Sequence, residues 1–178
     1  MAAARNLKSP GTGLVKLQLN TMKTTKTNAM RLLDGAGVAY ETSSYPTDGD
    51  IGALHTAEVL GISAELIYKT LVLEDGQGGH YVAVVPADAE LDLKKTAAHF
   101  GVKHVQLINW RTLRDVTGYI RGGCSPLGMK KLFPTVIEET AVLHDKLYVS
   151  AGLRGRQIVV NPQDLAQVVS AGFADIVQ

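Results

Sequence analysis

The apolar residues of the chain follow two periods, one typical of helices and the other typical of strands. Over residues 27–36 the apolar positions lie three or four apart, which predicts a helix that ends at Gly37. The same reasoning predicts four more helices: at 52–60, at 93–100 behind Asp92, at 109–117 behind Asn109, and from Pro162 to near Gly172.

Strands are predicted where apolar residues alternate with polar ones or form short runs. These segments are 38–45, 68–73, 80–85, 102–108, 135–138, 147–150, 157–160 and 173–177. The second and third segments flank EDGQGG at 74–79, which is typical of a hairpin turn. Hairpins mixed with helices, without a repeating βα unit, predict an α+β domain with a mixed, barrel-like β-sheet and surrounding helices.

Composition narrows the class of protein. The 178 residues are 46% hydrophobic and 20% charged, as in one ordinary globular domain. No apolar run reaches the roughly 20 residues of a membrane span, so no membrane partner is expected. The single cysteine excludes an intramolecular disulfide and fits a cytoplasmic location. It and the five histidines lack zinc-ligand spacing, so neither a metal nor a cofactor is expected.

Charge divides the chain into two parts. Residues 1–24 contain basic but no acidic residues, and they predict a flexible basic arm ahead of a domain at 25–178. The net charge of the whole chain is only +1, so nucleic acid would have to meet a local basic patch. Three basic pairs would form that patch if they lay on one face, and are otherwise solvated charges: Lys94 with Lys95, Lys130 with Lys131, and Arg154 with Arg156.

Lys69 lies within the predicted strand at 68–73. By alternation it shares a face with Leu71 and Leu73. A lysine is rarely buried without a partner or a function, because desolvating an ammonium group is costly. Taken alone, the pattern favours an amine that reaches water at the strand end, and a functional amine is the alternative.

The stretch GYIRGGCSPLGMKK at 118–131 is too rich in glycine for a helix interior or an ordinary strand. Gly122 and Gly123 let successive backbone N–H groups converge on an anion or an oxyanion. Ser125 adds a hydroxyl, and Pro126 stiffens the exit from the loop. A purely structural turn explains the same composition equally well.

Cys124 lies in the middle of this stretch and is a candidate nucleophile. No histidine is close in sequence to activate it. A lone cysteine of this kind is more often a small buried hydrophobe, and we favour that interpretation.

Four segments, in order and spacing, resemble the YbaK/EbsC family of aminoacyl-tRNA deacylases, which are relatives of the editing domain inserted in bacterial prolyl-tRNA synthetases. The resemblance runs from about residue 25 to residue 176. The matching segments are YKTL at 68–71, LDLKK at 91–95, GY at 118–119 with GGCSPLG at 122–128, and YVS at 148–150.

The resemblance implies a trans-editing hydrolase that deacylates mischarged tRNA at its 3′ aminoacyl end, typically Cys-tRNA(Pro). In such proteins the substrate's own thiol attacks its carbonyl, so no enzyme nucleophile is required. The resemblance implies that Lys69 is the central functional residue and that Tyr45 and Ser150 line the pocket. It also implies a loop that faces the ester and forms a wall opposite Lys69, made of Gly122, Gly123, Cys124, Ser125 and Pro126. At Gln157 relatives carry aspartate or glutamine, and we assign no role.

Three further expectations concern substrate and partner. Because the net charge is near zero, we expect tRNA specificity to be borrowed from prolyl-tRNA synthetase in a transient complex. A deacylase for Ala-tRNA(Pro), or for another small mischarged amino acid, is an alternative with the same fold. Another alternative is a non-catalytic module that binds tRNA or a synthetase, and the presence of Lys69 argues against it.

Overall fold

The computed structural model describes residues 25–47 and 49–178 of the chain, and the predicted arm at 1–24 lies outside them. The helices of this part are α1 (Asn28–Gly35), α2 (Ala53–Leu60), α3 (Leu93–Phe100), α4 (Leu113–Thr117) and α5 (Pro162–Val168), with short 3-10 helices η1 (Ala64–Leu66) and η2 (Glu139–Leu143). Its strands are β1 (Tyr40–Ser44), β2 (Tyr68–Glu74), β3 (His80–Pro86), β4 (Gln106–Leu107), β5 (Thr135–Glu138), β6 (Leu147–Ser150), β7 (Arg156–Val160) and β8 (Gly172–Ala174).

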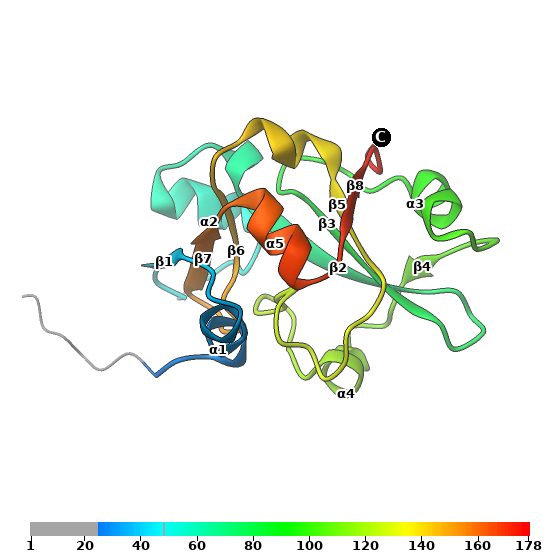
Figure 1. Ribbon diagram of the computed structural model, residues 1–178, viewed down its shortest axis with the longest axis horizontal. Helices are drawn as coiled ribbons and strands as arrows, with labels where there is room; N and C mark the ends of the chain where they lie inside the picture. The colour runs from blue at the N-terminus through cyan, green and yellow to red at the C-terminus, as the bar shows by residue number, and fades with distance from the viewer. Residues whose placement is uncertain (1–24, 48) are drawn as a thin grey trace, which may run out of the picture.

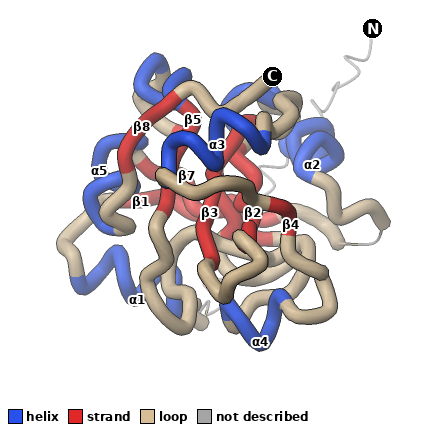
Figure 2. Tube along the Cα trace, turned by 90° about the vertical axis from the view of Figure 1, so that its right-hand side faces the viewer, coloured by secondary structure: helices blue, strands red, loops and turns tan. Residues whose placement is uncertain are grey.

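The strands form two sheets. The smaller sheet has the order β1-β7-β6 and is antiparallel, and the larger has the order β4-β2-β3-β5-β8. The larger sheet is mixed, because β3 pairs with β5, and β5 with β8, in parallel. Figure 1 shows the smaller sheet at one end of the molecule and α3 at the other, and Figure 2 shows helices around the strands.

This architecture confirms the predicted α+β class with a mixed sheet. The barrel-like closure stays a prediction, because the described strands belong to two hydrogen-bonded sheets. An isolated parallel bridge between Ile67 and Tyr148 links the start of β2 to β6.

Most predicted elements are confirmed close to their predicted ends. The predicted hairpin is the antiparallel pair β2 and β3, and the Asp75 carboxylate accepts the amides of Gln77 and Gly79 within its turn. Helix α3 begins behind Asp92, whose carboxylate accepts two backbone amides of the first turn, and ends at Gly101 with φ 68°. A left-handed residue of this kind is commonly glycine at a helix end.

Four predicted segments differ from the structure. The strand expected at 173–177 is the shorter β8, Gly172–Ala174. The strand expected at 102–108 is reduced to β4, an exposed edge strand that pairs with the end of β2. The helix expected behind Asn109 begins at Leu113, because the Asn109 side chain accepts the amide of Arg111 in a turn. The last helix ends at Val168, ahead of Ser170 with its left-handed φ of 53°.

Strands β2 and β3 bury apolar side chains on both faces, so the domain has two main apolar clusters. One cluster lies between the two sheets and contains Tyr68, Val82, Val84, Leu147, Val149, Ile158 and Val160, with α1 and α5 packed onto it. The second lies on the other face and contains Leu73, Ala83, Val85 and Ala97 of α3. Lys69 pairs with Val85, and its face, as predicted from alternation, is that of Leu71 and Leu73.

Candidate active site

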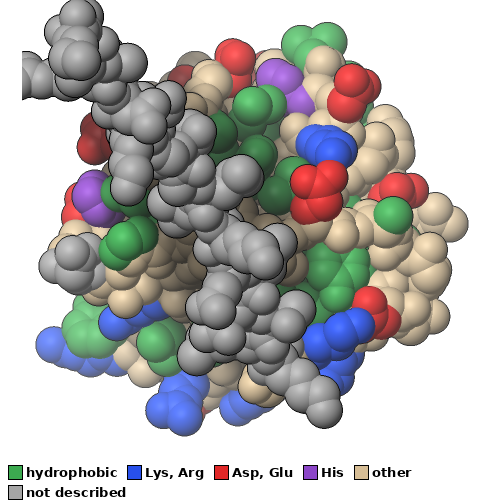
Figure 3. Space-filling model, turned by 90° about the vertical axis from the view of Figure 1, so that its left-hand side faces the viewer, with side chains coloured by type: hydrophobic (Ala, Val, Ile, Leu, Met, Phe, Trp, Pro, Cys, Tyr) green, Lys and Arg blue, Asp and Glu red, His purple; other side chains and the backbone are tan. Residues whose placement is uncertain are grey.

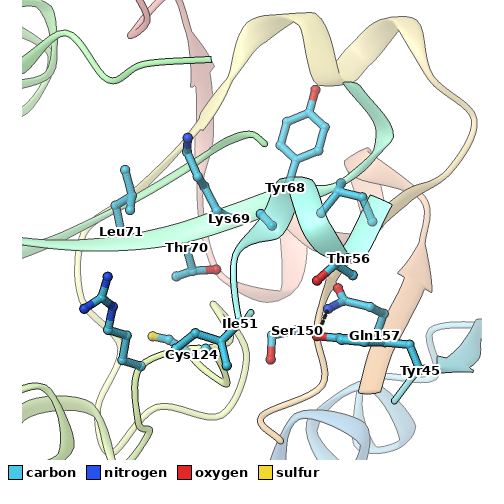
Figure 4. A pocket seen from close by; sticks show the side chains of 14 residues that line it. Tyr45, Ile51, Thr56, Tyr68, Lys69, Thr70, Leu71, Cys124, Ser150 and Gln157 are labelled. Atoms are coloured by element: carbon cyan, nitrogen blue, oxygen red, sulfur yellow. Dashed lines mark hydrogen bonds between the residues drawn. The ribbon is translucent and has the colours of Figure 1, made fainter. Parts of the chain in front are cut away.

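A cavity of about 190 Å³ opens where β2, the small sheet and the glycine-rich loop meet. Its walls come from segments that are far apart in the sequence: the end of β1, the start of α2, the start of β2, the loop after α4, β6 and β7 (Figure 4). The residues that line it are Tyr45, Ile51, Ala53, Thr56, Ile67, Tyr68, Lys69, Thr70, Leu71, Arg121, Gly122, Cys124, Ser150 and Gln157. This lining contains hydroxyl groups, one amide side chain and two cationic residues, but no carboxylate.

The cavity brings together five of the eight predicted site residues: Tyr45, Lys69, Gly122, Cys124 and Ser150. The other three, Gly123, Ser125 and Pro126, belong to the same loop but do not line the cavity. Ser125 is fully buried, and its hydroxyl accepts the amide of Leu127 at 3.2 Å. Pro126 lines a neighbouring hollow with Met129 and Phe133.

The loop approaches its neighbours so closely that Gly122 must lack a side chain. Gly122 has a φ of 84°, and a Cβ atom placed on it would lie 2.9 Å from Cβ of Ile51. The loop is also tied to the turn after β6, because Nε of Arg154 donates to the carbonyl of Arg121 at 2.9 Å. The backbone itself, not a side chain, therefore forms this wall of the cavity.

The amide groups of the loop differ in their hydrogen bonding. The amide of Gly123 donates to the carbonyl of Ile120 at 3.0 Å. Among the described residues, the amides of Cys124 and Ser125 have no hydrogen-bond acceptor. Cys124 lines the cavity, so its free N–H is the one that can stabilise an oxyanion there, whereas Ser125 is fully buried outside the lining.

Lys69 is held by backbone carbonyl groups beyond the end of β3. Its Nζ donates to the carbonyl of Ala89 at 2.7 Å and to that of Ala87 at 3.2 Å. In Figure 4 its side chain extends from β2 on the side opposite to Thr70, and it is Thr70 that points toward Cys124. Although Lys69 lines the cavity, its ammonium group is thus not the group that faces the loop.

Burial lowers the pKa of Lys69 from its ordinary value, and the nearby carboxylates of Glu90 and Asp88 partly oppose this shift. The amine is not freely solvated, and among the described residues no carboxylate forms a salt bridge with it. An amine that is partly desolvated and bound only to neutral carbonyls can exchange those partners for a phosphate or ribose oxygen.

Cys124 is a protonated thiol at neutral pH. Burial raises its pKa to about 12, and a hydrogen bond with Thr117 offsets only part of this effect. The thiolate is the nucleophilic form of cysteine, and the cavity lining contains no histidine that would generate it. These properties agree with the interpretation of Cys124 as a small hydrophobe, but the residue is half-buried and not fully buried.

Sequence reasoning missed several residues of this cavity, among them Thr56 and Arg121, and assigned no role to Gln157. The Gln157 side chain is buried within β7, and its Nε2 lies 3.5 Å from the hydroxyl of Tyr45. The one available signal was a polar residue in front of the apolar run at 158–160. That signal identifies an unusual position but not the cavity that it faces.

The three basic pairs do not form one patch. Figure 1 places α3, which carries Lys94 and Lys95, at the opposite end of the molecule from β7, which begins at Arg156. A second hollow of about 910 Å³ lies beside the first and includes Lys26, Arg31 and Arg156 in its lining. Figure 3 shows lysine and arginine side chains gathered along the lower part of this end of the molecule.

Two absences can be stated for residues 25–47 and 49–178. No group of three or more histidine, cysteine, aspartate or glutamate side chains is arranged to hold a metal ion there. None of the helices in this part of the chain has the length and apolar character required to cross a bilayer.

Comparison with known proteins defines the class to which this fold and cavity belong. The profile of the aminoacyl-tRNA editing domain family matches residues 53–168. A protein of Enterococcus faecalis (strain ATCC 700802 / V583), named "Putative Cys-tRNA(Pro)/Cys-tRNA(Cys) deacylase EbsC", is 44% identical over 152 residues, which cover 85% of this chain and 93% of that protein. The chain belongs to the aminoacyl-tRNA editing domain family.

Two more distant relatives agree with this assignment. A proline–tRNA ligase of Thermosipho africanus (strain TCF52B) is 28% identical over 97 residues, which are 54% of this chain but 17% of the ligase. A crystal structure described as "a putative trans-editing enzyme for prolyl tRNA synthetase" superposes with a TM-score of 0.73 at 21% identity, covering 86% of this chain and 99% of that one. The latter likeness establishes the fold.

Proposed function

We propose that this protein is a trans-editing deacylase that clears mischarged tRNA, with Cys-tRNA(Pro) as its main substrate and residues 25–178 as the editing domain. The observation that carries the proposal is the small polar cavity walled by the glycine-rich loop, in a chain of the editing domain family. At about 190 Å³ the cavity is smaller than the roughly 300–1,000 Å³ of pockets for drug-sized ligands. It suits one small aminoacyl group, while the nucleotide stays outside.

The reaction needs little from the protein, because an aminoacyl ester is already activated. The substrate's sulfur forms a bond to its own carbonyl carbon, and the bond from that carbon to the 3′ oxygen of the terminal ribose breaks. The thiol proton passes to the departing 3′ oxygen, and cysteine leaves as a cyclic thiolactone. The thiol and the carbonyl belong to the same aminoacyl group, so the attack is intramolecular and has a high effective concentration.

The proposed roles follow from where each group lies. The amide of Cys124 donates to the oxyanion that forms during the attack. Lys69 exchanges one of its carbonyl partners for the terminal ribose or phosphate and orients the ester at the mouth of the cavity. Tyr45 and Ser150 complete the wall around the aminoacyl group.

The tRNA backbone requires positive charge outside the cavity. The second hollow supplies Lys26, Arg31 and Arg156, and it includes Ser44 at the end of β1, next to Tyr45 of the first cavity. Lys26 is already paired with Asp34, so the local excess of positive charge is small. This favours a transient complex with prolyl-tRNA synthetase in the cytoplasm, in which the synthetase contributes most of the affinity for tRNA(Pro).

Replacing the Cys124 thiol tests which sulfur reacts. For Cys124→Ala we expect kcat/KM for Cys-tRNA(Pro) within about threefold of wild type, because a thiol with a pKa of about 12 supplies no nucleophile at neutral pH. Deacylation of purified, labelled Cys-tRNA(Pro) measures this directly. A loss of turnover in a folded Cys124→Ala protein would make Cys124 the nucleophile instead.

A substrate panel tests the proposed function. We expect the wild-type protein to release cysteine from tRNA(Pro) at least about tenfold faster than alanine, and to leave Pro-tRNA(Pro) intact, because alanine lacks the attacking thiol. Each rate is divided by the spontaneous hydrolysis rate of the same ester. Faster release of alanine would make Ala-tRNA(Pro) the substrate, and tRNA binding without release of any amino acid would indicate a binding module.

A further inference from the structure

Two polar atoms that border the cavity have no hydrogen-bond partner among the described residues. They are Oε1 of Gln157 and Oγ1 of Thr70, and both are buried. Tyr68 also lines the cavity and has an unpartnered buried hydroxyl, but Figure 4 shows that hydroxyl pointing away from Cys124 and Ser150. A buried acceptor without a partner destabilises the folded protein, so native proteins rarely contain one without a reason. Two such atoms in one cavity point to a ligand that supplies hydrogen-bond donors.

The surrounding strands hold Gln157 in place. Only 6% of its surface is exposed, and it lies on the central strand of the small sheet between Ser43 of β1 and Ser150 of β6. Its Nε2 is directed at the hydroxyl of Tyr45, 3.5 Å away, which leaves Oε1 for another partner. Figure 4 shows the Thr70 hydroxyl extending from β2 toward the same region of the cavity.

The size and charge of the cavity define the missing donor. A space of about 190 Å³ admits the aminoacyl group but not the nucleotide, so the donor belongs to the amino acid. The strong donor of an aminoacyl ester is its α-amino group, whereas a thiol donates weakly. The lining offers no carboxylate to bind an amine, and the Lys69 ammonium is engaged on the other side of β2.

We infer that Gln157 and Thr70 bind the α-amino group of the substrate, an assignment that rests on the proposed deacylase function. Oε1 of Gln157 accepts one N–H bond, and Oγ1 of Thr70 accepts a second. Fixing the amine fixes the position of the α-carbon, and with it the carbonyl relative to the amide of Cys124. The site therefore selects esters with a free α-amino group.

A substrate without the amine tests this inference. We would compare Cys-tRNA(Pro) with 3-mercaptopropionyl-tRNA(Pro), which keeps the thiol and the ester but lacks the α-amino group. For wild type we expect kcat/KM to favour the cysteinyl ester by about 10- to 100-fold after division by each spontaneous rate, the ratio supplied by one charge-assisted hydrogen bond. For Gln157→Met, which has a similar shape but no acceptor, we expect this ratio to fall to about threefold or less.

Further variants separate recognition from folding. Gln157→Glu keeps the acceptor and should keep the preference, while Gln163→Met, at an exposed position of α5, should match wild type. If Gln157→Met does not fold, Thr70→Val is measured instead, and its ratio should fall as well. A purely structural role for Gln157 would slow both substrates equally and leave the ratio unchanged.

The outcomes distinguish this inference from the proposed function. Equal wild-type rates on the two esters, or a preference that survives in both Gln157→Met and Thr70→Val, would overturn the assignment of the α-amino site while the deacylase function stands. If wild type released no cysteine from Cys-tRNA(Pro), the proposed function itself would fail.

Discussion

Lys69→Ala is expected to lower kcat/KM for Cys-tRNA(Pro) by about 100-fold or more, while the protein remains folded. Removing a single preorganised donor from a reacting centre commonly costs about 10²–10³ in rate. The Lys69 ammonium group is bound only to the neutral carbonyls of Ala87 and Ala89. It can therefore exchange them for an incoming ribose or phosphate oxygen. Single-turnover deacylation with excess enzyme measures the loss.

A matched lysine controls for charge. Lys94→Ala removes an exposed lysine from α3, at the other end of the molecule, and should deacylate like wild type. The far-ultraviolet circular dichroism of both variants should equal that of the wild-type protein. A folded Lys69→Ala protein with wild-type turnover would remove Lys69 from the mechanism.

The pH dependence offers an independent check on Lys69. Its pKa is lowered by burial, and the amine binds anionic oxygen only in its charged form, which exists below that pKa. The wild-type rate, divided by the spontaneous rate, should therefore decline with rising pH before the ordinary lysine value of 10.5 is reached. Lys69→Ala should lack this decline.

Replacing the substrate's sulfur by oxygen is the second change with a large expected effect. Ser-tRNA(Pro) should be deacylated at least about 100-fold more slowly than Cys-tRNA(Pro), because intramolecular attack by a well-placed thiol supplies a high effective concentration that a hydroxyl does not match. The two side chains are close in size, so a cavity of about 190 Å³ discriminates poorly between them by volume. A difference in rate would therefore report on chemistry.

The products give the decisive measurement. Mass spectrometry of early samples should detect a thiolactone from the cysteinyl substrate. Equal rates for seryl and cysteinyl esters would instead indicate that water or the ribose hydroxyl attacks. In that case the amide of Cys124 keeps its role, since each route passes through an oxyanion.

Much of the fold was predictable from local sequence. Helix α3 occupies the predicted residues 93–100, and the hairpin of β2 and β3 forms around the predicted EDGQGG turn. Periodicity, caps and turn residues act within a few positions of one another, so they can be interpreted without the rest of the chain. The prediction of a strand at 102–108 was wrong in length, because a strand needs a neighbouring strand to pair with. Only two residues of this segment pair with β2.

The sequence by itself determined the helices, the hairpin, the side of β2 on which Lys69 lies, and the glycine-rich loop that contains Cys124. Tertiary structure alone decided which groups meet, since the cavity is assembled from segments more than 100 residues apart, such as Tyr45 and Gln157. It also placed Thr70, and not the Lys69 ammonium, opposite the loop, because the two faces of β2 pack against different clusters. Only the tertiary structure shows that Oε1 of Gln157 lacks a hydrogen-bond partner, because the neighbours of a buried atom cannot be inferred from sequence spacing.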